Sequence, residues 1–121
     1  MSSKKIIILG GTGAIGSCLA QKIKNLDYDP IIIARSKNSL EKISEKINCE
    51  YFECDVLESD KLEKIINSFK NDIYGLAYCV GSINLKPLKL TKDSDFIESF
   101  KINTLGAINA IKAAQSSLSN N

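Results

Sequence analysis

The sequence predicts an α/β fold, with a four-stranded parallel sheet covered by helices on both faces. Short apolar runs alternate with segments whose apolar residues recur at helical spacing. The first two runs are continuously apolar, as in strands that are buried on both faces. Three glycines, Gly10, Gly13 and Gly16, separate the first run from the first helical segment. Right-handed crossovers favour the strand order 3-2-1-4 of a Rossmann-type, doubly wound sheet.

Two strand–helix units are expected at the start of the chain. Residues 5–9 form the first buried strand. The helix that follows has an apolar face formed by Ile15, Leu19, Ile23 and Leu26. A turn at residues 27–30 leads into the second strand, at residues 31–34. Asn38 is predicted to cap the second helix, because Glu41 three residues later completes a capping box.

The next unit has the same order. Residues 50–54 predict a third, weaker strand, and Ser59 or Asp60 is expected to cap the helix after it. The apolar face of that helix comprises Leu62, Ile65, Ile66 and Phe69. Residues 74–80 then predict a fourth strand.

A long helix is predicted to follow the fourth strand and a polar loop. It begins at Thr91 or Asp93. One stripe along it contains Phe96, Phe100, Asn103, Ala107, Ile111 and Ala114. The last six residues, 116–121, are polar and are expected to fray.

The composition is that of one soluble globular domain. The 121 residues suffice for a single core, and 44% of them are hydrophobic and 25% charged. The 16 basic and 14 acidic residues are interspersed and leave a net charge of +2. We therefore expect neither nucleic acid nor a membrane surface as partner. No apolar run approaches the ~18 residues of a membrane-spanning helix.

The residues that usually bind metal or form nucleophilic pairs are scarce. The four cysteines form no C-x-x-C pair, and the sequence has no histidine. No metal site is therefore expected, and a Ser-His or Cys-His catalytic pair is excluded. We predict that the cysteines are reduced and that the protein is cytoplasmic.

The spaced glycines predict a nucleotide-binding loop between the first strand and the first helix. Gly10 permits a sharp turn, Gly13 lets a pyrophosphate approach the backbone, and Gly16 lets the helix pack closely. The amino end of the helix offers free N–H groups and partial positive charge to phosphates. We count Thr12 and Ile15 of the same loop among the cofactor-binding residues. The strand before and the helix after are the context that this motif requires.

The residues after the second strand indicate which dinucleotide binds. An acidic residue there would hold a free ribose 2′-hydroxyl, whereas this chain has Arg35, Ser36 and Lys37. Cations suit a 2′-phosphate, so we expect NADP in preference to NAD. The alternative is that these are solvated loop charges. Arg35 also argues against a methyltransferase-like binder, which usually has an acidic residue at this place.

Together these residues resemble the short-chain dehydrogenase/reductase family over most of the chain. The glycines match its loop, although Leu9 replaces the usual threonine. The pair Asp55-Val56 resembles the family's adenine-contacting Asp-Val, although Asp55 has the alternative of capping a turn. Gly81 alone is retained from the family's N-N-A-G. The stretch around Asn103 resembles the helix that carries the family's active-site asparagine.

The resemblance implies hydride transfer between a nicotinamide dinucleotide and a carbonyl or alcohol. It also implies a catalytic serine and a Tyr-x-x-x-Lys motif, which this chain lacks, leaving Asn103 as an accessory catalytic residue. We therefore assign residues 1–121 to a dinucleotide-binding domain, incomplete relative to the family and inactive alone. The alternative is a non-catalytic NADP-binding module or redox-state sensor that acts through a partner. In either case a second copy or a partner chain is expected to cover the edge of the fourth strand.

Overall fold

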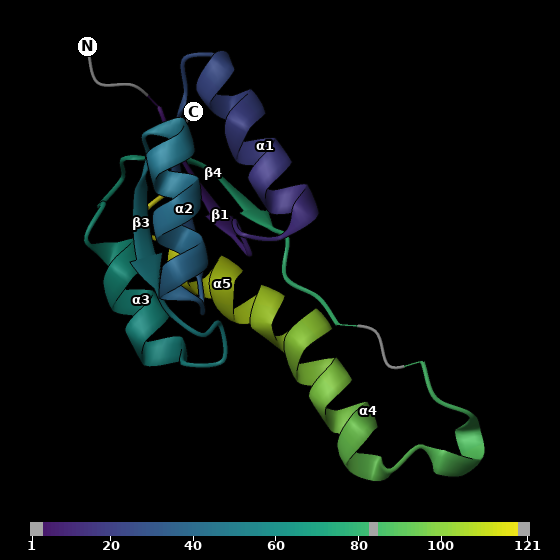
Figure 1. Ribbon diagram of the computed structural model, residues 1–121. Helices are drawn as coiled ribbons and strands as arrows, with labels where there is room; N and C mark the ends of the chain where they lie inside the picture. Colours follow the sequence, from purple (N-terminus) through teal and green to yellow (C-terminus); the bar gives the residue numbers. More distant parts are fainter. Residues whose placement is uncertain (1–3, 83–84, 119–121) are drawn as a thin grey trace.

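A four-stranded parallel sheet forms the centre of the computed structural model, which describes residues 4–82 and 85–118. The strands are β1 (Lys5–Leu9), β2 (Asp29–Ala34), β3 (Glu50–Glu53) and β4 (Ile73–Tyr78). Their order is β3-β2-β1-β4, and every pair is parallel. The predicted fold class and the strand order 3-2-1-4 are thus confirmed (Figure 1).

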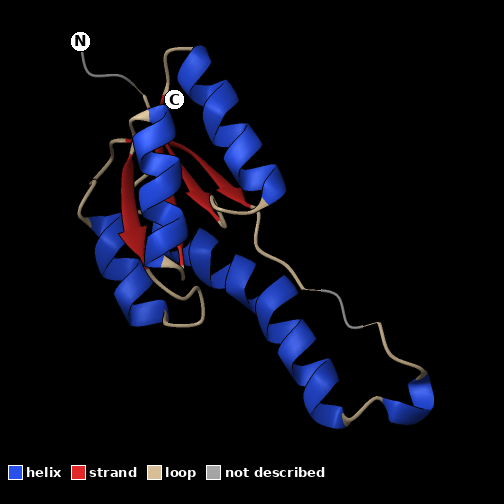
Figure 2. Cartoon of the chain, viewed as in Figure 1, coloured by secondary structure: helices blue, strands red, loops and turns tan. Residues whose placement is uncertain are grey.

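Helices alternate with the strands. They are α1 (Ala14–Asn25), α2 (Lys37–Ile47), α3 (Ser59–Asn67), α4 (Asp93–Phe100) and α5 (Gly106–Ala114). A short 3₁₀ helix, η1 (Leu88–Leu90), precedes α4, and a π turn, η2 (Lys101–Leu105), joins α4 to α5. Figure 2 shows that α4 and the η1 segment extend away from the sheet, whereas α5 returns beneath it.

The core lies in two layers because successive residues of a strand face opposite sides of the sheet. Ile8 and Ile32 pack with α1 and α2 on one face. Ile7 and Ile31 face the other side, where the buried residues of α3 and α5 cover them. The four isoleucines are fully buried, so the continuous apolar runs reflect burial on both faces.

The second strand begins earlier than the sequence indicated. Residues 29 and 30, expected to be part of a turn, belong to β2, and the Asp29 N–H donates to the Lys4 carbonyl oxygen at 2.8 Å. In a parallel sheet, successive residues of a strand direct their N–H groups to the two neighbouring strands in turn. The N–H that Pro30 lacks would point toward β3, which begins only opposite Ile31. The missing N–H therefore points to a place where no ladder partner is required.

Two predicted helix caps are wrong. Helix α2 is capped by Ser36, whose hydroxyl oxygen accepts from the Ser39 N–H at 3.3 Å, so Asn38 lies inside the helix. Helix α3 begins at Ser59 with Glu58 at the N-cap and no side-chain cap. Because β2 ends at Ala34, the chain is free to begin α2 at Lys37, directly after Ser36.

The carboxyl end of the described chain is packed rather than frayed. Ser117 is 2% exposed, and its carbonyl oxygen accepts from the Ile73 N–H at 3.2 Å. Leu118 forms an isolated parallel bridge with Ile73, so pairing begins at the outer edge of β4. The expectation of fraying is therefore wrong for residues 116–118, and residues 119–121 lie outside the described chain.

Candidate functional site

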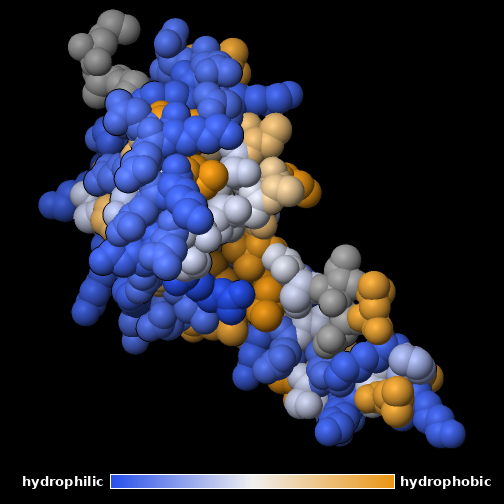
Figure 3. Space-filling view, in the orientation of Figure 1, coloured by the Kyte–Doolittle hydropathy of each residue, from blue (hydrophilic) through white to orange (hydrophobic). Residues whose placement is uncertain are grey.

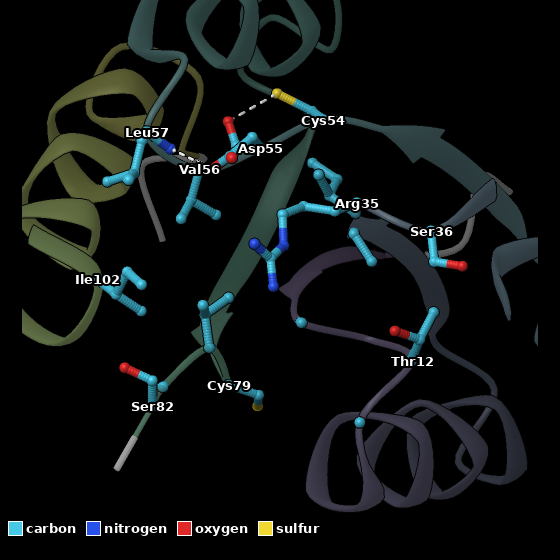
Figure 4. A pocket seen from close by; sticks show the side chains of 16 residues that line it. Thr12, Arg35, Ser36, Cys54, Asp55, Val56, Leu57, Cys79, Ser82 and Ile102 are labelled. Atoms are coloured by element: carbon cyan, nitrogen blue, oxygen red, sulfur yellow. Dashed lines mark hydrogen bonds between the residues drawn. The ribbon is translucent and has the colours of Figure 1, made fainter. Parts of the chain in front are cut away.

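A cavity of about 530 Å³ opens where the carboxyl ends of the four strands meet (Figure 4). Ligands of open α/β sheets bind at this edge, beside the point where the strand order reverses. That point lies between β1 and β4. The cavity is lined by Gly10, Thr12, Gly13, Ile33, Ala34, Arg35, Ser36, Cys54, Asp55, Val56, Leu57, Cys79, Val80, Gly81, Ser82 and Ile102.

Two glycines of the loop after β1 are required by the fold itself. Gly10 has φ +79°, and a Cβ there would lie 2.6 Å from the Cys79 carbonyl oxygen. A Cβ on Gly16 would overlap the carbonyl oxygen of Gly10. Neither obstacle is a side chain that can rotate away, so the loop keeps its shape only without these methyl groups.

Gly11 is a third packing glycine, which the sequence-based reasoning missed as a site feature. Its Cβ would lie 2.6 Å from Cβ of Ile32, in the central strand β2. The loop therefore lies directly on the sheet. Pattern spacing alone does not reveal this contact, because Ile32 is 21 positions away in the sequence.

Gly13 differs from its neighbours. It lines the cavity and is the N-cap residue of α1. A Cβ there would meet only the Gly10 carbonyl oxygen within 4 Å, at an ordinary 3.6 Å. The described chain thus has room for a methyl group at this position. The first N–H groups of α1 have no intrahelical acceptor, and they give the loop an affinity for anions.

The residues after β2 divide between the cavity and α2. The exposed Arg35 side chain extends into the cavity (Figure 4). Ser36 lines the cavity too, but its hydroxyl caps α2. Lys37 is the first residue of α2, is exposed and lies outside the lining. Arg35 is thus the cation directed into the cavity from this segment.

Asp55 both lines the cavity and shapes the turn after β3. Its Oδ1 accepts from the Leu57 N–H at 2.9 Å, and its carbonyl oxygen accepts from the Cys54 thiol at 3.3 Å. The turn-capping alternative is therefore confirmed. The bond also holds the carboxylate beside Val56, which is 5% exposed and lines the same wall.

Asn103 ties the π turn to the loop after β4. Its side-chain N–H group donates to the Ser82 carbonyl oxygen at 3.0 Å, and its Oδ1 accepts from the Ser82 N–H at 2.9 Å. The same Nδ2 donates to Ser99 Oγ at 3.1 Å. Ser82 and Gly81 line the cavity, so Asn103 braces a wall without lining it. Both polar atoms of the exposed Asn103 side chain thus bind partners other than the backbone of the helix.

Eight of the expected cofactor-binding residues line the cavity: Gly10, Thr12, Gly13, Arg35, Ser36, Asp55, Val56 and Gly81. Ile15, Gly16 and Lys37 do not, and Ile15 is 77% exposed at the start of α1. Lining residues that the sequence reasoning missed include Cys54, Cys79 and Val80. Cys54 and Cys79 follow a strand directly, and Val80 is the second residue after β4. The rule that parallel strands present their carboxyl ends to ligands could have found them.

Thiol reactivity provides a test of the packing around the four cysteines, of which Cys54 and Cys79 line the cavity. Burial raises the pKa of Cys49, Cys54 and Cys79, so each has less thiolate near neutral pH than an ordinary cysteine. Cys18 is exposed on α1. We expect the exposed Cys18 to react with a maleimide at least about tenfold faster than Cys49, Cys54 and Cys79 at pH 7. The reactions of Cys49, Cys54 and Cys79 should keep accelerating as the pH rises above 9.0, the ordinary pKa of a thiol, because their own pKa values are higher. Peptide mapping of the labelled chain would contradict this packing if all four cysteines reacted alike.

Clusters of metal-ligating side chains and long apolar helices would mark a metal site or a membrane span. Within 4–82 and 85–118, no group of three or more His, Cys, Asp or Glu side chains is placed to hold a metal ion. Across the same residues, every helix is too short or too polar to cross a lipid bilayer.

Comparisons with known proteins agree with this geometry. The sequence matches the family model described as "short chain dehydrogenase" over residues 4–121. It is 33% identical over 112 residues to the chloroplastic chlorophyll(ide) b reductase NOL of Arabidopsis thaliana, covering 84% of this chain and 32% of that protein. It is 29% identical over 116 residues to a UDP-glucose 4-epimerase of Mycoplasma genitalium, covering 90% and 31%.

Among solved structures, one described as ElxO with NADP bound superposes with a TM-score of 0.83 at 25% identity. The match covers 93% of this chain and 49% of that one. The chain thus spans about a third of the length of the curated relatives it matches, and about half of this solved chain.

Proposed function

The chain belongs to the short-chain dehydrogenase family, and we propose that residues 1–121 form the NADP(H)-binding domain of an oxidoreductase that acts on a carbonyl or alcohol. When bound, the dinucleotide donates or accepts a hydride. The observation that carries the proposal is the space at Gly13, where packing does not require a glycine but the backbone faces the cavity.

A pyrophosphate fits the glycine loop. Gly10 and Gly11 contact the chain after β4 and strand β2, and Gly16 holds α1 close to the loop. These contacts leave Gly13 as the residue that a phosphate can approach. The amino end of α1 adds donors and partial positive charge. Thr12 lines the same side of the cavity, and Ile15 follows at the first turn of the helix. We assign Gly10, Thr12, Gly13, Ile15 and Gly16 to the diphosphate end of the cofactor.

The adenosine end fits the opposite wall. Asp55 and Val56 form the turn after β3, and the resemblance to the family's Asp-Val pair assigns them to adenine. Arg35 extends into the cavity from β2, where a guanidinium favours a 2′-phosphate by paired, charge-assisted hydrogen bonds. Ser36 and Lys37 complete this basic segment. The cofactor we propose is accordingly NADP in preference to NAD.

The nicotinamide end is assigned to the wall formed after β4. Gly81 and Ser82 line it, and the paired hydrogen bonds from Asn103 hold the backbone of Ser82 in place. We propose that Asn103 acts as an accessory residue by fixing this wall. Because the chain lacks Tyr-x-x-x-Lys, we further propose that it binds the dinucleotide without turning over a substrate alone.

A partner surface belongs to the same proposal. Figure 3 shows hydrophobic atoms over α5 and near the η1 segment. Large apolar side chains are exposed along both α4 and α5. They are Phe96, Ile97, Phe100, Ile108 and Ile111. We propose that a second copy or a partner chain covers the edge of β4 together with these side chains, which would remove a large apolar area from water. The four free cysteines support a reducing, cytoplasmic setting.

Titration with reduced dinucleotides tests the function. We expect the fluorescence of NADPH to change on binding to the full chain, with a Kd at least about tenfold below that of NADH. Similar affinities for NADPH and NADH would overturn the preference for NADP. Binding of neither, beside tight binding of S-adenosylmethionine, would overturn the dinucleotide site.

A further inference from the structure

Tyr78, the last residue of β4, makes an unusual contact with the long helix. Its hydroxyl donates a hydrogen bond to the Ile102 carbonyl oxygen at 2.6 Å, across 24 positions of sequence. The side chain is partly buried and packs against the core beneath the sheet. This bond joins the end of the strand to the middle of the π turn.

The π turn supplies the acceptor for that bond. In an α-helix the Gly106 N–H would donate to the Ile102 carbonyl oxygen, four residues earlier. Here the Gly106 N–H donates to Lys101, five residues earlier. The Ile102 carbonyl oxygen is therefore available to the Tyr78 hydroxyl. Isolated π turns within helices are frequent at functional sites.

Gly106 makes room for the tyrosine. A Cβ at this buried position would overlap the Tyr78 hydroxyl, and it would lie 3.2 Å from the Lys101 carbonyl oxygen. A side chain at 106 would therefore displace the hydroxyl from its bond. The glycine, the tyrosine and the π turn depend on one another.

The consequence of this arrangement reaches the cavity. Ile102 lines the cavity wall, and Asn103, the next residue, holds Ser82 by two hydrogen bonds. We propose that Tyr78 is a positioning residue, whose hydroxyl holds the π turn so that Ile102 and Asn103 shape the nicotinamide end of the cofactor cavity. The link to a cofactor rests on the proposed function.

The chemistry of Tyr78 suits a permanent donor. Burial, and to a smaller extent the charge of Asp55, raises the pKa of the phenol. The hydroxyl therefore stays protonated throughout the neutral range and well above it. The contact acts as a fixed brace rather than a switch.

Removal of one oxygen atom tests the proposal. In Tyr78→Phe, we expect the Kd for NADPH to rise about threefold and by no more than about tenfold, because a residue that acts through others cannot pass on more than the free energy of the one neutral hydrogen bond that is lost. The side-chain amide signals of Asn103 in NMR spectra should also shift, because its contact with Ser82 loosens. The matched control is Tyr74→Phe on the same strand, where the ring stacks on Tyr28 and lies outside the cavity lining. This control should leave both readouts unchanged.

A second variant checks the dependence on Gly106. Gly106→Ala should weaken NADPH binding as Tyr78→Phe does. The double variant should be weaker than either single variant by less than the product of the two effects, because the obstructed hydroxyl is already gone and only the approach to the Lys101 carbonyl oxygen remains. The proposal would be overturned if the increases in Kd of the two single variants multiplied in the double variant. It would also be overturned if Tyr78→Phe weakened NADPH binding while the Asn103 signals stayed unchanged. Identical behaviour of Tyr78→Phe and Tyr74→Phe would do the same. If the unmodified chain binds no NADPH, the proposed function fails, and the Asn103 signals across the four variants still decide whether Tyr78 holds the π turn.

Discussion

Replacement of Gly16 by alanine is expected to lower the free energy of unfolding by about 3 kcal/mol, a large effect for overpacking. The added methyl would overlap the Gly10 carbonyl oxygen and lie 3.0 Å from Cα of Gly11. Both obstacles are backbone atoms, so relief requires α1 to move away from the sheet. Urea denaturation followed by circular dichroism measures the change.

Gly13→Ala is the matched control for that substitution. Its methyl group meets one atom at 3.6 Å, so the free energy of unfolding should change by less than about 1 kcal/mol. NADPH binding should nevertheless weaken more than about tenfold, because the methyl group occupies the approach of the pyrophosphate. If both variants lost the same stability and Gly13→Ala still bound NADPH normally, the loop would be a structural turn only.

The second large effect is expected at Arg35. Arg35→Ala should weaken NADPH binding by about 30- to 100-fold, the equivalent of losing charge-assisted hydrogen bonds to a phosphate. NADH, which lacks the 2′-phosphate, should bind as before. Fluorescence titrations with NADPH and with NADH measure, for each dinucleotide, the ratio of the Kd of the variant to that of the unmodified chain.

Lys42→Ala serves as the charge control for Arg35→Ala. Lys42 is exposed on α2 and lies outside the cavity lining, so its removal changes the net charge equally without removing a contact. We expect its affinity for NADPH to stay within about twofold of the unmodified chain at physiological salt. Equal losses in the two variants would reduce Arg35 to a solvated loop charge.

The strand order could be predicted because the pattern is local and repeated. Continuous isoleucine runs such as residues 31–33 require burial on both faces, and handed crossovers then determine the order. The cap of α2 was misassigned because Ser36 and Asn38 are both good caps. The sequence around them does not show at which residue β2 ends. That point depends on pairing with β1 and β3.

The π turn could not be predicted from the sequence of its own helix. It depends on the Tyr78 hydroxyl, which arrives from β4, and on the absence of a side chain at Gly106. The apolar residues between 96 and 114 therefore recur at the spacing of one long helix, and a single helix is what the sequence predicts. Its division into α4, η2 and α5 follows from contacts with the rest of the fold.

The candidate site was predictable where its residues form local motifs. The glycine loop and Arg35 were found from their positions after strands, and Asp55 from the resemblance. Ile102 was missed because it reaches the cavity from the long helix, next to the bond between Asn103 and Ser82 that spans 21 positions. Ile15 was included as part of the motif, yet its side chain points to solvent.

Mapping of NADPH binding by two-dimensional NMR of the labelled, full chain tests the central claim most directly. Binding at the carboxyl edge of the sheet should shift the backbone amides of Gly13, Arg35, Asp55 and Gly81 together, at one common Kd. The amide of Lys64, on α3 and outside this cavity, should stay in place. If NADPH shifted no amide around the cavity, or shifted only residues elsewhere, the cavity would not be a dinucleotide site.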